Sequence, residues 1–309
     1  IVKNLYLSNS GVEYQEANTK YNLEDISINL KQNSSTDYQF NGGFYLNNKE
    51  HDFNYTAQIS KNNVEINGKL SSEYYEFENA GKYNIELKKG SLYSDGYLKN
   101  LSLLSKIEGL KVNELYLSSN LDFDNNNFDF SSLQIKANDN NIYGNAKVKI
   151  SNGKSIISLN LNADYLDLNK IYSSKNSHKN VTDETGSQKK DNNKREKNFN
   201  KNLFEVSKNL NISSIFNAKK IFYREIYLDN IKLKINKKDN IEVNLKANNF
   251  FKSQLESKLL LSKKMEYSFN NTLKGFNLRE FNNLYNINLV HGYLDLNSNL
   301  KGVVKHQNN

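Results

Sequence analysis

The sequence predicts a mainly β protein, built as an antiparallel meander of many short strands. Apolar residues recur at every second position through most of the chain, which is the side-chain period of a strand that buries one face. Clusters of Asn, Asp, Gly and Lys, such as residues 138–141 and 237–240, separate these runs at spacings of about 8–12 residues and suit turns. Little of the chain has a helical period, so we expect helices to contribute little.

The alternating runs define the expected strands in chain order. Each run places apolar side chains on one face of a strand and mostly polar side chains on the other. The apolar members are Ile26, Ile28 and Leu30; Phe53, Tyr55, Ala57 and Ile59; Val64 and Ile66; Tyr83, Ile85 and Leu87; Leu133, Ile135 and Ala137; Ile142, Ala146, Val148 and Ile150; Ile157, Leu159, Leu161 and Ala163; Ile231, Leu233 and Ile235; Ile241, Val243, Leu245 and Ala247; Met265, Tyr267 and Phe269; and Leu294, Leu296 and Leu300.

Two short segments have a helical period instead. Apolar residues fall at i, i+3 and i+7 in each segment. A helix of one or two turns is not stable alone, so we expect both to cap the sheet. The two sets are Leu203, Val206 and Leu210, and Leu278, Phe281 and Tyr285.

Residues 173–201 are almost free of apolar side chains and carry eight Lys or Arg against four acidic residues. Such a composition predicts a disordered linker or insertion. It divides the chain into an N-terminal part, residues 1–172, and a C-terminal part, residues 202–309. Because Phe199 is the only aromatic residue in this basic run, which thus lacks the several stacking aromatics of a nucleic-acid site, we expect no nucleic-acid partner.

Composition limits the remaining classes. The chain has 309 residues, 37% hydrophobic residues, a mean hydropathy of −0.78 and a net charge of +8. Its 20 Tyr and 16 Phe argue against general disorder, and the absence of Cys excludes disulfides and thiolate metal sites. No apolar run is long enough to span a bilayer. Because the chain starts at Ile1 and has a single Met, we interpret it as an excised or processed region.

Residues that could support catalysis or bind a metal are not arranged for either. His51, His178, His291 and His306 are scattered without ligand spacing. The segment from Asp122 resembles a calcium loop, but its sixth and twelfth positions are Asn127 and Leu133 rather than Gly and Glu. The isolated pair at residues 42–43 suits a turn or bulge. We therefore expect no enzyme activity, no cofactor and no metal.

A sheet with one apolar face must cover that face. The two short helical segments are too few, which leaves a sandwich or barrel, or a strongly curved sheet whose apolar face lines a trough. A trough of this kind would suit acyl chains. A two-chain phospholipid in water exposes about 30 methylenes at ~0.8 kcal/mol each, a penalty on the order of 20 kcal/mol. A groove that holds the chains removes most of this penalty and needs no catalytic residue.

Four segments together resemble the AsmA-like proteins of Gram-negative envelopes. Residues 2–30 are similar to a strand–turn–strand of that family, with Tyr14 and Glu16 as its aromatic and acidic residues and Glu where the family usually has Asp. Residues 133–172 resemble its strand pair, which ends in a Leu-Asp-Leu element before a linker, and residues 217–261 resemble its C-terminal meander. Residues 273–302 are similar to its hallmark. These segments contain Leu166-Asp167-Leu168, then Gly275, a short helix, Gly292 and Gly302.

The resemblance implies a U-shaped β-groove with an apolar inner face. It also implies a periplasmic protein of outer-membrane biogenesis, held in the inner membrane by an anchor outside this chain. The expected activity is non-enzymatic transfer of phospholipid between the two membranes, with outer-membrane or periplasmic proteins as further partners. Two alternatives stay open: a scaffold or assembly factor for outer-membrane proteins, and a secreted β-sandwich adhesin.

The residues expected to line the groove come from the alternating runs. Charged substitution among them, for example at Val148, is expected to impair lipid binding. The candidates are Ile142, Val148, Ile150, Leu159, Leu161, Leu233, Ile235, Val243, Leu245, Tyr267, Phe269, Leu294 and Leu296.

Overall fold

A computed structural model describes residues 4–16, 19–46, 48–101, 110–151, 153–172, 209–263, 265–285 and 291–303, with only the backbone at 13–16 and 19–22. These residues form seventeen strands and two helices, so the predicted mainly β class is confirmed. The chain divides into two compact units, Ile1–Ala146 and Lys147–Asn309. The predicted linker at 173–201, and Leu203 and Val206 of the first predicted helix, lie outside the described residues.

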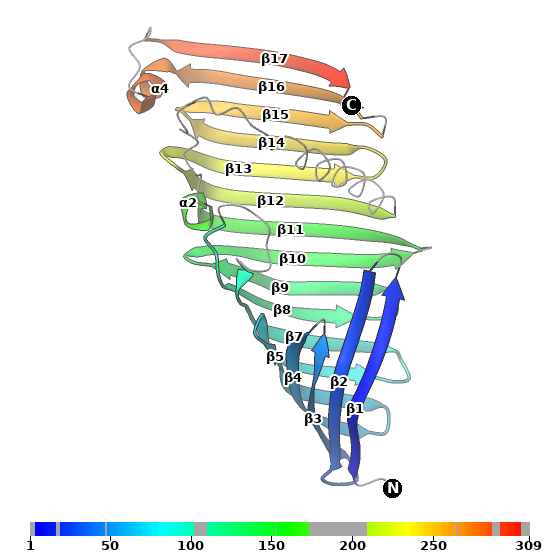
Figure 1. Ribbon diagram of the computed structural model, residues 1–309. Coiled ribbons are helices and arrows are strands. Elements are labelled where there is room, and N and C mark those ends of the chain that lie inside the picture. Colours follow the sequence, from blue (N-terminus) through cyan, green and yellow to red (C-terminus); the bar gives the residue numbers. More distant parts are fainter. Residues whose placement is uncertain are drawn as a thin grey trace, which may run out of the picture. The chain divides into compact units, whose positions relative to one another are not determined.

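The first unit is a meander in which each strand pairs with the next along the chain, antiparallel from β1 to β9 (Figure 1). The unit boundary falls within its last strand. The strands are β1 (Asn4–Glu16), β2 (Thr19–Gln32), β3 (Asp37–Leu46), β4 (Lys49–Ser60), β5 (Asn63–Ser72), β6 (Tyr75–Asn84), β7 (Lys89–Leu98), β8 (Leu115–Phe123), β9 (Asn127–Ala137) and β10 (Asn140–Ser151).

The second unit continues the strand order with one departure from the predicted topology. β11 and β12 pair in parallel, whereas β12 to β17 pair antiparallel in chain order. A parallel pair cannot be joined by a tight hairpin and requires a longer connection, here residues 168–209. The elements are β11 (Lys154–Asp167), α2 (Leu168–Ile171), β12 (Leu210–Tyr223), β13 (Ile226–Lys237), β14 (Ile241–Phe250), β15 (Ser253–Leu261), β16 (Glu266–Asn277), α4 (Leu278–Tyr285) and β17 (Tyr293–Val303).

The strands are longer than predicted. They have nine to fourteen residues, against a usual length of about five or six. The run of Tyr83, Ile85 and Leu87 was also wrongly predicted as a single strand. β6 ends at Asn84, whose side chain accepts a hydrogen bond from the Leu87 N–H at 2.8 Å. This bond closes the β6–β7 turn and leaves Ile85 and Leu87 exposed.

The helices are partly as predicted. α4 covers Leu278, Phe281 and Tyr285 and is capped by Asn277, whose side-chain oxygen accepts from the N–H groups of Arg279 and Glu280 at 3.0 and 3.3 Å. Leu210, expected in a helix, is instead the first residue of β12. α2 was not predicted. Its cap is the Asp of the Leu-Asp-Leu element, at residue 167.

In the described residues, neither unit has a conventional hydrophobic core. Among the described residues no large side chain is fully buried, and four of the eight buried apolar residues are alanines. A sandwich would bury the inward side chains of both its sheets, so neither unit is a sandwich in the part that is described. The buried apolar residues are Val112, Ala146, Ala163, Leu166, Ala218, Ile231, Ala247 and Phe276.

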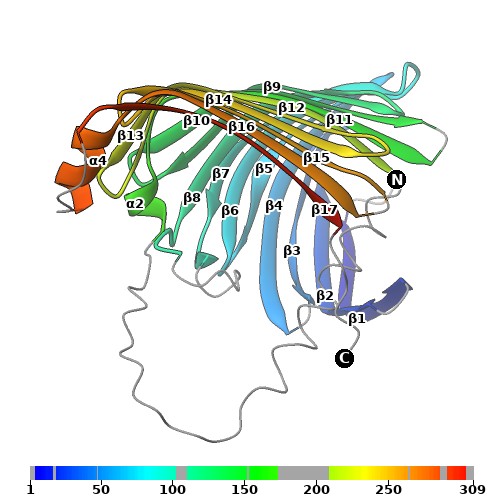
Figure 2. The same cartoon turned by 90° about the horizontal axis from the view of Figure 1, so that it is seen from above.

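Three β-bulges lie at one end of the second unit, the end at which α4 follows β16. The register of the ladders shifts around Asn230, Asn249 and Gly275, each in the left-handed backbone region with φ of 50°, 62° and 69°. The Asn249 amide donates to the Asp229 carboxylate at 2.9 Å and links two of the bulges. Bulges bend strands and increase their twist, and the strands of this unit arch along their length (Figure 2).

The bulge at Asn230 yields a stability prediction. Asn tolerates the left-handed region, whereas Val in that backbone conformation costs about 1–2 kcal/mol or more. We expect Asn230→Val to lower the free energy of unfolding by at least that amount in urea titrations. Asn236→Val is the matched control, because Asn236 is exposed on the same strand without positive φ. Equal stability of the two variants would contradict the assigned bulge.

Candidate functional site

The second unit presents one largely apolar face across its strands. Leu233 lies opposite Leu245, and Val243 lies opposite both Ile235 and Leu259. The same rows continue into β16 and β17, where Leu259 pairs with Phe269 and Phe269 with Leu300. Since residues opposite each other in a ladder share a face, the side chains form a single surface. We call it the apolar face of the second unit.

Ten of the thirteen predicted groove residues lie on β11, β13, β14, β16 and β17, within this face. The other three lie on β10. Ile150, Leu294 and Leu296 are exposed by 42%, 42% and 47%. Ile142 belongs to the first unit. Val148 and Ile150 alternate on β10 with exposed lysines. The half-buried candidates are Ile142, Val148, Leu159, Leu161, Leu233, Ile235, Val243, Leu245, Tyr267 and Phe269.

Sequence reasoning missed several members of the face. Ile212 and Phe216 on β12 pair with Ile157 and Leu161, but Ser214 between them interrupts the apolar period. In β15, three consecutive leucines at 259–261 mask the period of two. Leu259 and Leu261 lie on the apolar face, whereas Leu260 lies on the opposite face. Counting period two across the interruptions would have recovered them. The further members are Ile212, Phe216, Leu255, Leu259, Leu261 and Leu273.

The opposite face of the second unit is polar and cross-linked by ion pairs between neighbouring strands. Lys246 pairs with Glu256 at 2.8 Å and Lys258 with Glu242 at 2.7 Å. Hydrogen bonds from these lysines lower the pKa values of both glutamates. Exposed pairs of this kind contribute little stability. They do show that this face is suited to water, in contrast to the apolar face.

Aromatic side chains close the helix end of the second unit. Phe251 lies 5.2 Å from Phe276 and 5.5 Å from Phe281 of α4, measured between ring centroids. Phe276 is the most buried of the large side chains in this group, with 8% exposure. An ion pair of 2.5 Å between Lys252 and Glu280 also ties the β14–β15 turn to α4. This end is therefore covered by rings and a helix.

Lysines gather at the other end of the second unit, formed by the β10–β11, β13–β14 and β15–β16 turns. Lys237 is the last residue of β13 and lies on the apolar face, between Ile212 and Ile241 in register. Its Nζ donates to the main-chain oxygen of Leu210 at 2.5 Å. Burial lowers its pKa, and the positive charge of Lys263 lowers it further. We call this region the lysine end.

The first unit has its own apolar face, and glycines bring its aromatic rings close to the sheet. Gly90 lies opposite both Tyr83 and Phe123, whose rings stack 6.1 Å apart. A Cβ at Gly90 would be 2.5 Å from Phe123 Cζ, and one at Gly68 would be 2.4 Å from Tyr55 Cδ1. A side chain in place of these glycines would therefore displace the rings.

The glycine pair at residues 42–43 follows the same rule rather than the predicted turn or bulge. Both residues lie inside β3 and pair with β2 and β4 without a register shift at the pair itself. A Cβ at Gly42 would be 1.9 Å from the Ser27 carbonyl oxygen and 3.0 Å from Phe53 Cζ. Close approach of backbone and ring therefore explains this glycine.

One polar pair interrupts the apolar face of the first unit. His51 is 5% exposed, and its ring stacks between Phe44 and Tyr75 at centroid distances of 4.9 and 5.5 Å. A hydrogen bond of 2.6 Å joins His51 Nδ1 to the Tyr75 hydroxyl. Burial lowers the pKa of His51, with a smaller opposing effect from Asp52. The imidazole is therefore held neutral.

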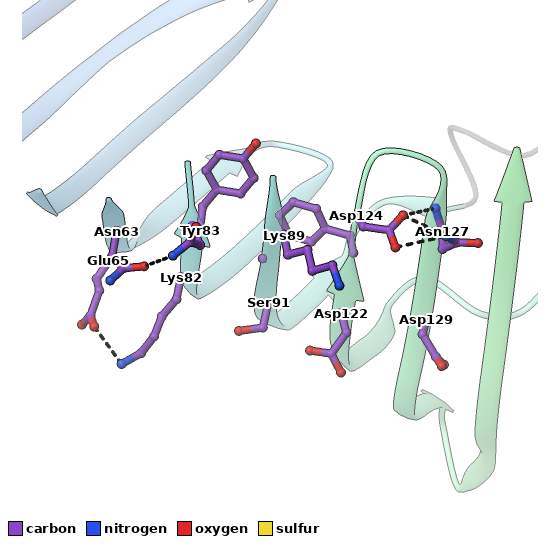
Figure 3. A pocket seen from close by; sticks show the side chains of 13 residues that line it. Asn63, Glu65, Lys82, Tyr83, Lys89, Ser91, Asp122, Asp124, Asn127 and Asp129 are labelled. Atoms are coloured by element: carbon purple, nitrogen blue, oxygen red, sulfur yellow. Dashed lines mark hydrogen bonds and ion pairs between the residues drawn. The ribbon is translucent and has the colours of Figure 1, made fainter. Parts of the chain in front are cut away.

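A hollow of about 690 Å³ in the first unit is lined in part by the segment with calcium-loop spacing, including Asp122, Asp124 and Asn127 (Figure 3). Its polar groups already bind each other: Lys82 pairs with Glu65 at 2.8 Å, and Asp124 accepts the N–H groups of Asn126 and Asn127 at 3.0 Å each. Asp124 thus closes the β8–β9 turn. In the part of the chain that is described, no three acidic or histidine side chains are grouped to hold a metal.

No family model, curated protein or solved structure matches this chain. The resemblance to AsmA-like proteins stays a prediction. Within the described ranges, no helix has both the length and the apolar composition needed to cross a bilayer.

Burial of His51 predicts a pH dependence of stability. Its pKa is near 6.5 in the unfolded chain and lower in the folded one, so the unfolded state binds more protons below about pH 6.5. The free energy of unfolding should fall on acidification from pH 7.5 to 5.5, with a slope of at most about 1.4 kcal/mol per pH unit. His51→Phe should reduce this slope in urea titrations. An unchanged slope in His51→Phe would show that His51 is not the group responsible.

Proposed function

We propose that this protein binds phospholipid acyl chains on the apolar faces of its sheets and carries them, without catalysis, between the inner and outer membranes of a Gram-negative envelope. The single observation that carries the binding proposal is the half-buried state of these faces: Leu233, Val243 and Leu245 lie in a largely apolar surface over which the described residues place no second layer. The membranes and the periplasmic location come from the resemblance to AsmA-like proteins.

The dimensions of the face suit an acyl chain. A strand of ten residues such as β14 is about 33 Å long, at about 3.3 Å per residue. The hydrocarbon core of a bilayer is about 30 Å thick, so the chains of one leaflet extend about 15 Å. The face is therefore long enough for an extended chain in the strand direction. Its members are mostly aliphatic and aromatic, and Ser257 and Asn271, which lie on the same face, are hydrogen-bonded to each other.

Energetics favour occupation of the face. Each methylene transferred from water to an apolar surface contributes about 0.8 kcal/mol, and the half-exposed side chains on the protein gain from the same contact. An adhesin with a sandwich fold would have satisfied these faces internally, and neither unit is a sandwich in its described residues. Lipid binding accounts for the exposed rows at Leu294, Leu296 and Leu300 as well.

A charge placed on the face tests the proposal. Val243→Asp puts a carboxylate among Ile235, Leu259 and the lipid, where its burial without a partner is costly. We expect about tenfold less phospholipid to copurify with this variant than with the wild type, as measured by mass spectrometry of extracted lipid. Asn244→Asp is the matched control, because it adds the same charge one residue away, opposite Lys234 and Lys258 on the polar face; its lipid content should be unchanged.

Folding is checked separately by circular dichroism and urea titration. If Val243→Asp proves unstable, Leu300→Glu makes the same test at a position already 56% exposed. A wild-type protein that is well folded and free of lipid would contradict the proposal and favour a scaffold that acts on outer-membrane proteins.

A further inference from the structure

We infer that two copies of this chain associate through β17, and that the two β17 strands pair antiparallel about a twofold axis at Ser298. The second units of the two copies would then share one sheet, with their apolar faces on the same side. This inference goes beyond the proposed function and does not depend on it, because it rests on the backbone of an edge strand and on the order of its side chains.

β17 is an edge strand in the described part of the second unit. It pairs with β16 along one side, and no other described strand of the unit pairs with its second side. Figure 1 shows it in red as the last strand of that unit. In an antiparallel ladder, alternate residues direct their N–H and C=O groups to opposite sides, so one row of these groups is left unpaired. Such a row is a template for a further strand.

β17 lacks the features that usually prevent such pairing. Natural edge strands are often short, contain Pro or several lysines, or are bent by a bulge. β17 has eleven residues, no Pro, and one lysine, Lys301, against one acidic residue, Asp295. No residue in it has positive φ. Leu296 and Leu300 are exposed, because their apolar neighbours in register lie on the β16 side alone.

The sequence of β17 is complementary to itself in one antiparallel register, in which Ser298 lies opposite the same residue of the second copy. Opposite charges then face each other, and so do an aromatic and a β-branched residue, as in the cross-strand pairs that stabilise sheets. Two leucines also cover each other's apolar surface. By symmetry each pair occurs twice. The facing pairs are Tyr293 and Val303, Leu294 and Gly302, Asp295 and Lys301, Leu296 and Leu300, and Asn297 and Asn299.

Face alignment and charge together select this register. An axis placed between two residues would set the apolar face of one copy beside the polar face of the other. Moving the axis to either neighbouring asparagine keeps the faces aligned, but Asp295 and Lys301 then each lie opposite an uncharged residue. The axis at Ser298 therefore combines aligned apolar faces with paired charges.

The two charged side chains are available for this contact. Lys301 is exposed and has no acidic partner within the described ranges. Asp295 is also exposed, and its Oδ1 accepts the Gly275 N–H at 2.6 Å. In the same part of the chain its Oδ2 has no partner, and a carboxylate can accept several hydrogen bonds. Residues that face each other across a ladder have Cβ atoms about 5 Å apart, within reach of a lysine ammonium.

Charge reversal at the two positions tests the association. In sedimentation velocity the wild type should behave as a dimer of chains of 35.7 kDa each. Asp295→Lys and Lys301→Asp each set like charges opposite each other at two places, so either variant alone should dimerise at least about tenfold more weakly. An equimolar mixture of the two variants should form the dimer again, because both facing pairs then carry opposite charges.

Lys234→Asp is the matched control. Lys234 is exposed on the polar face of β13, an inner strand, so this variant makes the same change in net charge away from the edge. It should dimerise like the wild type. Circular dichroism and urea titration check the fold of each variant, in particular Asp295→Lys, which loses the bond to Gly275.

A disulfide at the axis tests the register without changing any charge. The chain has no Cys, and Ser298→Cys would bring two thiols into facing positions with Cα atoms about 4.5–5.5 Å apart, within disulfide range. Oxidation with copper phenanthroline should therefore give a covalent dimer. Asn270→Cys on β16 is the control. Three strand spacings, at least about 14 Å, would separate it from its copy, so it should stay uncrosslinked.

Several results would overturn the inference. They are a wild type that is monomeric at about 100 µM, a mixture of charge variants that stays monomeric, and equal crosslinking of Ser298→Cys and Asn270→Cys. Open-ended oligomers would also overturn it, because they would indicate that β17 pairs with a different strand of the next copy. None of these measurements involves lipid, so failure of the dimer leaves the proposed function standing.

Discussion

The structure depends on the contrast between the two faces of each sheet. Period-two alternation places Leu, Ile, Val and aromatic side chains on one side and Asn, Lys and acidic residues on the other, and the hydrogen-bonded ladders keep these rows in register. A one-residue slip would turn Leu233 or Val243 to the polar side, so the same pattern specifies both the pairing and the surface. Because the described part of each unit has no second layer, the surface that directs strand pairing is also the surface available to a ligand.

Small backbone features shape this surface. Asn230, Asn249 and Gly275 place bulges at one end of the second unit, beside the aromatic cluster and α4. In the first unit, glycines on the apolar face let rings lie against the neighbouring strand. Asn230 and Asn249 thus occupy positions at which the backbone is left-handed, a conformation that Asn tolerates better than most residues.

Much of the fold could be predicted from the sequence, because alternation is a direct physical signal. It indicated most strands, and the i, i+3, i+7 spacing indicated α4. The parallel β11–β12 pair could not be predicted, since pairing direction depends on a connection and not on the alternation in either strand. Alternation indicated the apolar face of the first unit only in part, at residues 26–30, 53–59, 64–66 and 133–137. Gly68, Gly90 and Gly96 occupy positions on this face and break the apolar period, and an aromatic residue lies opposite each of them in the ladder. Lys237 was missed because a lysine at a strand end usually marks a turn.

The central claim is that acyl chains lie on one face only, and paramagnetic broadening of methyl signals tests it most directly. A phospholipid with a nitroxide on its acyl chain should broaden the methyl signals of Leu233, Val243 and Leu245. Leu260 and Ile156 provide internal controls, because both are apolar and exposed, by 37% and 40%, on the opposite face. Broadening is expected in the first group alone. Equal broadening of both groups, or none in either, would contradict it.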